Sequence, residues 1–383
     1  MKMRILLYRA SPFWNGNEDY ADFKNAEGQN LFPVAYDANR WKIAADYGRT
    51  AIKAIEDGGY KLYRAASDDP LENYRDIFLN HFNDEVLFAK NFHNWDWPER
   101  CSNPNGMGGW SGNNPTQEII DAYEMEDGST PITGYNADGS PVINVASGYR
   151  ESGLFNQDHP KGYHLSGIFY MYAKREPRFY ATISYNNAFW KTRRLNFLRG
   201  AVDGSKGGPD YTTTGYLSRK YLDEKGVDIL QGRFTNKSWI YYRLGELYLN
   251  YAEALNESAG PVEDVYTYVN AIRNRSGLPD LPEDLNKDQM RERIRHERQI
   301  ELAFETHRYF DCHRWKIAHI TDNRAIHGMD IQATTTAGFY KRIVVEKRVF
   351  ETPKHYLWPI RQNEINKAPT LYIQNPGWTT SKE

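Results

Sequence analysis

The chain has 383 residues, with 48 Lys and Arg against 50 Asp and Glu, so its formal net charge is −2. This balance gives no overall electrostatic attraction to nucleic acid or to an anionic membrane. No apolar run approaches the roughly 18 residues that a membrane-spanning helix needs. Two cysteines, Cys101 and Cys312, are too few for a disulfide framework or a cysteine metal cluster.

Aromatic residues are in surplus, since the chain contains 28 Tyr, 17 Phe and 10 Trp. Protein cores prefer Leu, Ile and Val, whereas Tyr and Trp suit surfaces that must be apolar and polar at once. The surplus is the first indication of a binding surface.

The first predicted element is a helix over residues 1–9, which Ser11-Pro12 would end because a residue before proline avoids the helical region. Its short apolar run is below the roughly 7–15 residues of a secretory signal. A helix at the first residue implies packing partners outside this sequence, so we expect an amino-terminally truncated chain.

A second helix is predicted up to Gly58-Gly59, because apolar residues recur every three or four positions. These residues are Trp41, Ala45, Gly48, Ile52 and Ile55. From residue 61 to 235 the sequence pattern changes. Gly, Asn and Pro become frequent there, and apolar and polar residues alternate over short runs. Strands are expected there at 85–92 and 178–186.

Helical spacing returns near residue 239 and again after Gly260-Pro261, which predicts a helical hairpin of the tetratricopeptide size class. A third long helix is predicted over 287–318, and one strand over 342–350. We divide the chain into a helical scaffold remnant (1–60), a loop-rich region with short strands (61–235), the hairpin plus third helix (236–320) and a carboxyl-terminal segment (321–383). We expect one compact unit.

The third helix carries glutamates on the face that should be buried. Its helical phase passes through Met290, Ile294, Glu297, Glu301, Phe304 and Arg308. Unpaired buried charges would cost several kcal/mol, so Glu297 or Glu301 should pair with arginines such as Arg298, Arg308 or Arg314. A carboxylate pair for acid–base chemistry is the alternative interpretation, and a structural ion-pair network is the one we favour.

Several segments in chain order look like the motifs of one known family. The longest is 297–311 (ERQIELAFETHRYFD) with Trp315. The others are 6–12 (LLYRASP) with 15–17 (NGN), 115–118 (PTQE) leading to 121–123 (DAY), 175–179 (REPRF), and 356–360 (YLWPI) with 363–364 (NE) and 375–377 (NPG). Together they cover nearly the whole chain and resemble the SusD/RagB family of glycan-binding outer-membrane lipoproteins, in which 297–311 would be the signature helix.

The resemblance implies a mainly α fold with tetratricopeptide-type hairpins and an embedded region of loops and short strands. It also implies a non-catalytic protein, exposed at the surface of the outer membrane. Such a protein captures oligo- or polysaccharide and delivers it to a SusC-like TonB-dependent transporter. The family's acylated lipoprotein cysteine has no match here, so contact with the membrane would need an anchor absent from this chain.

The main candidate site is a loop rich in Trp, Asn and Gly. Sugars present C–H faces that lie on flat rings, and hydroxyls that need planar donors and acceptors. The candidate ligand-binding residues there are Trp95, Trp97, Trp110, Asn94, Asp96 and Asn113. A second cluster adds Tyr185 and Trp190. The alternative for both clusters is ordinary packing, under a long loop or beside an edge hairpin.

Two other classes of function stay open. Aromatic residues are also enriched at protein interfaces, so a helical-repeat protein that binds another protein without binding glycan is an alternative. A glycoside hydrolase would need two carboxylates across a cleft, and Asp96 and Glu99 form the pair to examine. Signatures of zinc proteases, phosphate loops and serine nucleophile elbows are absent, so we expect no enzyme activity, no metal and no cofactor.

Overall fold

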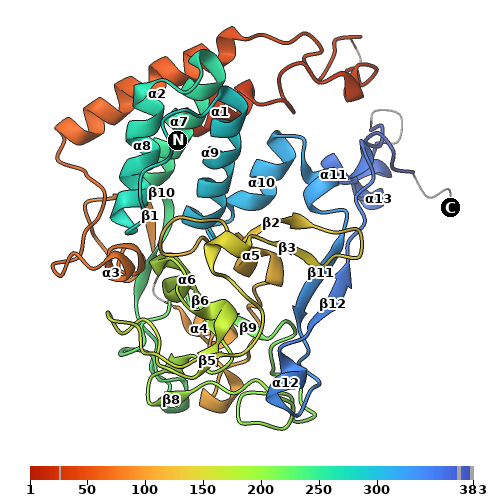
Figure 1. The fold of residues 1–383 in the computed structure, drawn as a ribbon. Coiled ribbons are helices and arrows are strands. Elements are labelled where there is room, and N and C mark those ends of the chain that lie inside the picture. Colours follow the sequence, from red (N-terminus) through yellow and green to blue (C-terminus); the bar gives the residue numbers. More distant parts are fainter. Residues whose placement is uncertain (26, 93, 369–371, 380–383) are drawn as a thin grey trace.

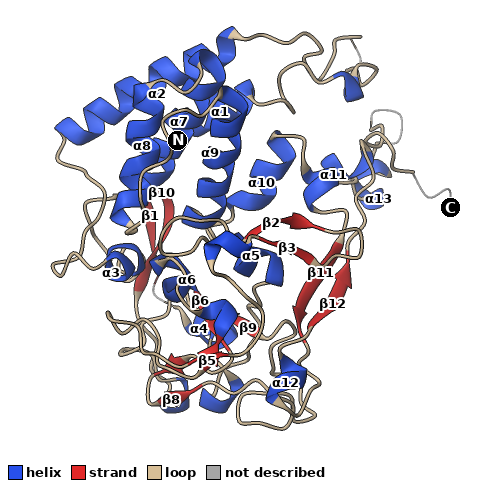
Figure 2. Ribbon diagram, in the orientation of Figure 1, coloured by secondary structure: helices blue, strands red, loops and turns tan. Residues whose placement is uncertain are grey.

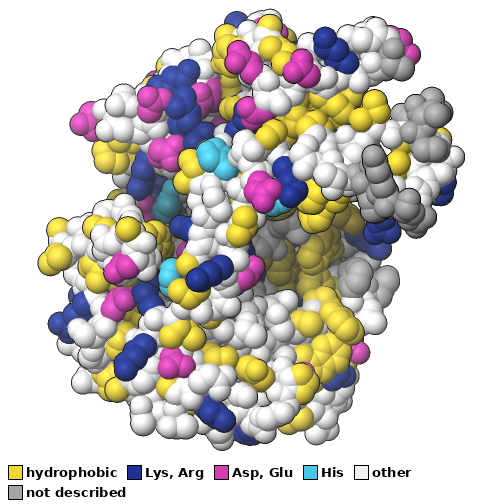
Figure 3. Space-filling view, turned by 90° about the vertical axis from the view of Figure 1, so that its right-hand side faces the viewer, with side chains coloured by type: hydrophobic (Ala, Val, Ile, Leu, Met, Phe, Trp, Pro, Cys, Tyr) yellow, Lys and Arg dark blue, Asp and Glu magenta, His cyan; other side chains and the backbone are white. Residues whose placement is uncertain are grey.

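The computed structural model describes residues 1–25, 27–92, 94–368 and 372–379. The fold is mainly helical (Figure 2), as predicted. Long helices gather at one end of the molecule, and loops with short strands form the other end (Figure 1). The face on the side of strands β11 and β12 is hollowed near its middle, with hydrophobic side chains beside the hollow (Figure 3).

The helices are α1 (Lys2–Ala10), α2 (Asn39–Asp57), α3 (Pro70–Arg75), α4 (Asp96–Ser102), α5 (Gln117–Ala122), α6 (Pro177–Thr182), α7 (Leu244–Ala259), α8 (Glu263–Arg275), α9 (Lys287–Glu301), α10 (His307–Arg314), α11 (Ala318–Thr321), α12 (Thr336–Phe339) and α13 (Gln362–Ile365). The strands are β1 (Val86–Phe92), β2 (Ile132–Tyr135), β3 (Pro141–Ile143), β4 (Leu154–Phe155), β5 (Ile168–Phe169), β6 (Ile183–Tyr185), β7 (Phe189–Trp190), β8 (Arg193–Arg194), β9 (Tyr216–Ser218), β10 (Lys237–Arg243), β11 (Ala325–Met329) and β12 (Arg342–Lys347). They pair as two-stranded antiparallel ladders.

Helix α7 is the centre of the helical layer, and its residues 244–256 are all buried. Its buried polar residues have partners from other segments, because Arg4 binds Glu246, Arg298 binds Asn250 and Arg314 binds Glu253. Helix α2 approaches it closely at Gly48, where an added Cβ would lie 2.9 Å from Cδ2 of Tyr251. The predicted hairpin is present, because α7 and α8 are joined by the short turn 260–262.

Two boundaries in the predicted helices and strands are wrong. The segment before Leu244 is the strand β10, in which Ile240 pairs with Ala89 of β1, so α7 begins later than residue 239. The predicted strand 178–186 begins as the short helix α6, and only its last part forms β6. Pro177 at the first helical turn has the φ that a helix needs, which favours this start.

The predicted long helix 287–318 is two helices with a break between Glu301 and His307. Phe304 (φ 60°) and Thr306 (φ 67°) adopt the left-handed conformation in this break. That conformation is costly for residues other than glycine and persists where surrounding contacts impose it. Here Glu305 provides such a contact, because its carboxylate binds Arg243 at 2.8 Å and Lys220 at 2.7 Å.

The buried glutamates of α9 form an ion-pair network, as predicted, but with partners from distant segments. Glu301 binds Arg178 (3.1 Å), Arg243 (2.7 Å) and Arg275. Glu297 binds Arg178 and Arg273. The same arginines also reach Glu85, Glu124 and Glu176. These contacts join the start of β1, the helix α6, the end of β10 and the hairpin to α9.

The arginines that sequence analysis named as partners of Glu297 or Glu301 have other roles, so this part of the prediction is wrong. Arg298 and Arg314 bind Asp311 and Glu253 instead. Arg308 forms no ion pair within the part of the chain that the structure describes. Helix periodicity placed the glutamates correctly, but their partners come from elements that are distant in the sequence.

Removal of one network charge tests its contribution to stability. In Glu301→Gln, Arg243 and Arg275 would lose a charged partner inside the protein, so we expect a loss of about 3–5 kcal/mol in the free energy of unfolding, measured by urea titration. The matched control is Asp57→Asn, which removes a solvent-exposed pair with Lys53 on α2 and should leave the urea midpoint unchanged. Equal midpoints for wild type and Glu301→Gln would contradict the prediction.

The network also predicts loss of stability in acid. Burial acts to raise the pKa of Glu305, but Arg243 and Lys220 outweigh it and lower that pKa to about 2. The pKa of Asp311, between Arg298 and Arg314, is likewise lowered to about 2. An unfolded carboxyl titrates near 4, so the unfolded chain binds protons first. Stability should be complete above about pH 5 and fall steadily toward pH 2. A thermal midpoint that stays constant from about pH 6 to about pH 2.5 would contradict this.

Candidate functional site

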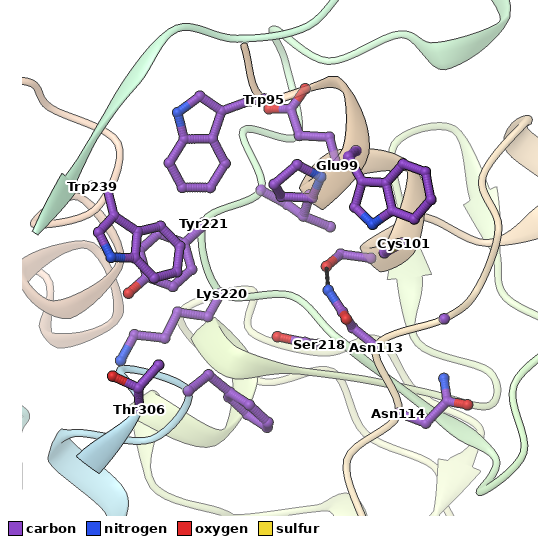
Figure 4. A pocket seen from close by; sticks show the side chains of 16 residues that line it. Trp95, Glu99, Cys101, Asn113, Asn114, Ser218, Lys220, Tyr221, Trp239 and Thr306 are labelled. Atoms are coloured by element: carbon purple, nitrogen blue, oxygen red, sulfur yellow. Dashed lines mark hydrogen bonds between the residues drawn. The ribbon is translucent and has the colours of Figure 1, made fainter. Parts of the chain in front are cut away.

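A cavity of ≈ 560 Å³ lies where α4, the loop after it, the β9–β10 segment and the α9–α10 break meet (Figure 4). Aromatic rings line one part of it and amide or hydroxyl side chains another. The aromatic residues are Trp95, Trp97, Tyr221, Trp239 and Phe304, and the polar ones include Asn113, Asn114, Ser218 and Thr306. This combination matches the chemistry that sequence analysis expected of a sugar site.

Two parallel rings form the aromatic wall of this cavity. Tyr221 and Trp239 lie nearly parallel, with centroids 5.7 Å apart and an angle of 12° between the rings, and Figure 4 shows them overlapping. Both are partly exposed. Trp95 stacks against Tyr221 at 5.6 Å and donates its indole N–H to the carbonyl of Lys237 at 2.7 Å. Trp95 therefore supports the wall from behind.

The three predicted loop tryptophans differ in exposure. Trp95 is 2% exposed, whereas Trp97 is 69% exposed and reaches the cavity from α4. Trp110 packs its edge against Trp97 with centroids 4.8 Å apart, and Arg100 lies 5.6 Å from its ring. The packing alternative thus describes Trp95, while Trp97 is the loop tryptophan whose exposed ring can stack on a ligand.

The predicted polar residues of the loop are spread over different places. Asn113 lines the cavity and donates to Oγ of Ser102 at 2.8 Å. Asn94 accepts the backbone N–H of Asp96 at 2.9 Å, at the start of α4. Asp96 itself is bound by Arg100. Asn113 is therefore the member of this group placed to meet a ligand, and the other two shape the helix start.

The second predicted cluster lies in the core of the loop region. Tyr185 and Trp190 are 2% and 1% exposed. Tyr185 packs against Tyr172 with centroids 4.4 Å apart, and the guanidinium of Arg219 lies 4.8 Å from the ring of Trp190. Neither ring offers an exposed face to a ligand in this structure. They belong to the packing that the alternative interpretation described.

Charged groups beside the cavity are already bound within the protein. Glu99 is fully buried, pairs with Lys237 and accepts the N–H of Thr235 at 3.1 Å. Lys220 donates to Glu305, to the carbonyl of Ala303 and to the Tyr74 hydroxyl at 2.7–2.8 Å. Burial lowers the pKa of Lys220 to about 8, against the opposing effect of Glu305. Asp96 is bound to Arg100 and Glu99 to Lys237. Both carboxylates that a glycoside hydrolase would use here are therefore already engaged in ion pairs.

Five residues that line the cavity were not predicted as site residues from the sequence: Tyr221, Trp239, Phe304, Ser218 and Thr306. These residues come from segments more than a hundred positions from Trp97, and no local spacing connects them to it. The pairing of β10 with β1 brings Trp239 opposite Lys90, close to the start of α4. Across the described residues, no cluster of three or more His, Cys, Asp or Glu side chains could hold a metal ion. No helix among them has the length and apolarity to cross a membrane.

The different burial of Trp95 and Trp97 can be tested by measuring the free energy of unfolding of their alanine variants. Trp95→Ala should lower the free energy of unfolding by about 3–5 kcal/mol, because it removes a buried ring and leaves a cavity. Trp97→Ala removes an exposed ring and should leave the urea midpoint nearly unchanged. Equal midpoints for the two variants would contradict the placement of these rings.

Comparisons with known proteins agree with this fold. The model of the SusD family matches residues 73–378. The SusD-like protein P2 of Formosa agariphila is 30% identical over 166 residues, which are 42% of this chain and 30% of that protein. The SusD-like protein P25 of the same organism is 38% identical over 81 residues, 20% of this chain and 15% of that protein. The matched segments thus span less than a third of either relative.

Solved structures show the same architecture. A SusD-like protein from Bacteroides fragilis NCTC 9343 is 29% identical with a TM-score of 0.65, over 89% of this chain and 64% of that one. The structure of a protein named BT4246 is 24% identical with a TM-score of 0.81, over 98% of this chain and 70% of that one, and shows the fold alone. Since the family model matches most of the sequence, the chain belongs to the SusD family.

Proposed function

We propose that this protein binds oligo- or polysaccharide in the cavity beside α4 and releases it chemically unchanged. The observation that carries the proposal is the wall of two parallel rings, Tyr221 and Trp239, facing a cavity that also presents Asn113 and Ser218. Membership of the SusD family supports the same ligand class. A SusD-like carbohydrate-binding protein from Bacteroides fragilis NCTC 9343 has the same fold.

The chemistry of binding follows from the two kinds of lining. A sugar ring would lie with its C–H face on the flat rings of Trp239 or Trp97, and we take such a contact to be worth as much as a pair of aromatic rings, about 0.5–1.5 kcal/mol beyond burial of area. Amide groups such as that of Asn113 select the pattern of hydroxyls. The carboxylates nearest to the tryptophans are held in ion pairs by Arg100 and Lys237, which supports binding without hydrolysis.

Delivery of the ligand to a SusC-like TonB-dependent transporter, and exposure at the surface of the outer membrane, are further parts of the proposal. Their support is the family to which the chain belongs. The protein-interaction alternative predicts a flat apolar contact surface, whereas Trp97 borders a hollow with polar groups. That concave shape favours a small ligand or a polysaccharide chain over a flat protein partner.

Affinity electrophoresis in gels that contain soluble polysaccharides tests the proposal. We expect at least one polysaccharide to retard the wild-type chain. Trp239→Ala and Trp97→Ala should each weaken the binding about 2- to 10-fold, the equivalent of one lost stacking contact.

The matched control is Trp14→Ala, which removes another partly exposed tryptophan, one that stacks on Phe32 away from this cavity. All variants are first shown to be folded by circular dichroism. Unchanged retardation of both cavity variants would contradict the site. No retardation by any polysaccharide would contradict the function and favour the protein-interaction alternative.

A further inference from the structure

A second cavity of ≈ 540 Å³ adjoins the first. The two share Asn114, Phe304 and Thr306 as lining residues, so one continuous ligand could enter both. The second cavity lies among α5, α10 and β11, which are close together in Figure 1. Most of its lining comes from segments that the proposed stacking site does not use.

One lining residue of this second cavity, Glu118, has a buried carboxylate oxygen without a partner in the part of the chain that the structure describes. Glu118 of α5 is 8% exposed, and its Oε1 lies 2.9 Å from both the backbone N and the Nδ1 of His327. Its Oε2 has no hydrogen-bond partner among the described residues. A buried acceptor that is left unsatisfied costs about 1–3 kcal/mol, so each such atom requires an explanation. A ligand hydroxyl in the cavity would satisfy it.

Two arginines at the same cavity are also without a charged partner in the described part of the chain. Arg324 has a buried Nε with no hydrogen bond, and its guanidinium lies 5.4 Å from the ring of Tyr135. Arg308 forms no ion pair. Their neighbour Arg348 differs, because Asp322 (3.9 Å) and Glu346 (3.3 Å) offset its charge. Arg308 and Arg324 therefore leave positive charge available at the cavity.

Aromatic side chains connect the two cavities. Phe304, at the helix break, belongs to both and is 38% exposed. Tyr309 and Phe310 continue along the second cavity with exposed fractions of 42% and 51%. A chain of sugar rings that leaves the Tyr221–Trp239 wall would meet these side chains next.

We propose that the second cavity binds an acidic unit of the same saccharide chain, a sugar that carries a carboxylate or a sulfate group. Arg308 and Arg324 bind the anion, since a guanidinium pairs with planar or tetrahedral oxyanions through several N–H donors. Oε2 of Glu118 accepts a hydrogen bond from a hydroxyl of that unit. This inference rests on the proposed function and narrows its substrate class to acidic polysaccharides.

The test compares charged polysaccharides with their neutral counterparts by affinity electrophoresis. One pair is polygalacturonate and its carboxyl-reduced form, and the other is carrageenan and its desulfated form. We expect at least one charged member to bind the wild-type chain at least about 10-fold more tightly than its neutral counterpart, since two guanidinium contacts to one anion are charge-assisted. The two pairs separate a carboxylate from a sulfate as the recognised group.

The double variant Arg308→Gln/Arg324→Gln should lose this preference and bind both members of the pair alike, with a weaker dependence of affinity on salt. Its control is Arg361→Gln, which removes a charge at an exposed position outside both cavities and should keep the preference. Both arginines are at least partly exposed, so folding of the variants is expected and is checked by circular dichroism.

The two proposals fail in different ways. Wild-type binding to neutral polysaccharides only, or a charge preference that survives in the double variant, would overturn the acidic subsite and leave glycan binding intact. Absence of binding to every polysaccharide would overturn both. Loss of the preference in the double variant, with retained binding to the neutral form, would support the second cavity specifically.

Discussion

The carboxylates at the end of α9 bind arginines from segments that lie far apart in the chain, and the arrangement of the molecule depends on these pairs. Glu301 alone contacts Arg178, Arg243 and Arg275, which belong to α6, β10 and α8. A buried charge is tolerated only where its partners are held in place. The network therefore requires the helical layer and the loop region to dock in one relative position, which also places the cavity between them.

The same network explains the interruption of the signature helix. Glu305 reaches Arg243 and Lys220 only because the chain leaves helical geometry after Glu301. The cost is a left-handed backbone at Phe304 and Thr306. Both residues consequently line the two cavities. A structural requirement of the core thus determines where the exposed ring of Phe304 borders the proposed ligand site.

The distribution of charge separates structural groups from groups that remain available. The carboxylates and arginines of the α9 network are paired with one another, and Glu99 and Asp96 beside the tryptophans are paired as well. The binding that we propose at the first cavity would accordingly use ring faces and neutral donors and acceptors. Arg308 and Arg324 stand apart, because no carboxylate of the described residues neutralises them. This difference is the physical basis for assigning the two cavities to different parts of one ligand.

The sequence by itself determined the long helices of the helical layer, the hairpin, the buried glutamates of α9 and the family resemblance, because helical spacing, turn residues and short motifs are local properties. It also identified the tryptophan-rich loop, yet it could not distinguish Trp95 from Trp97, two positions apart. That difference depends on Tyr221 and Trp239, which cover one ring and leave the other exposed. Ion partners, the helix break and the exposure of each ring were decided by tertiary structure, since each depends on contacts between segments that are distant in the chain.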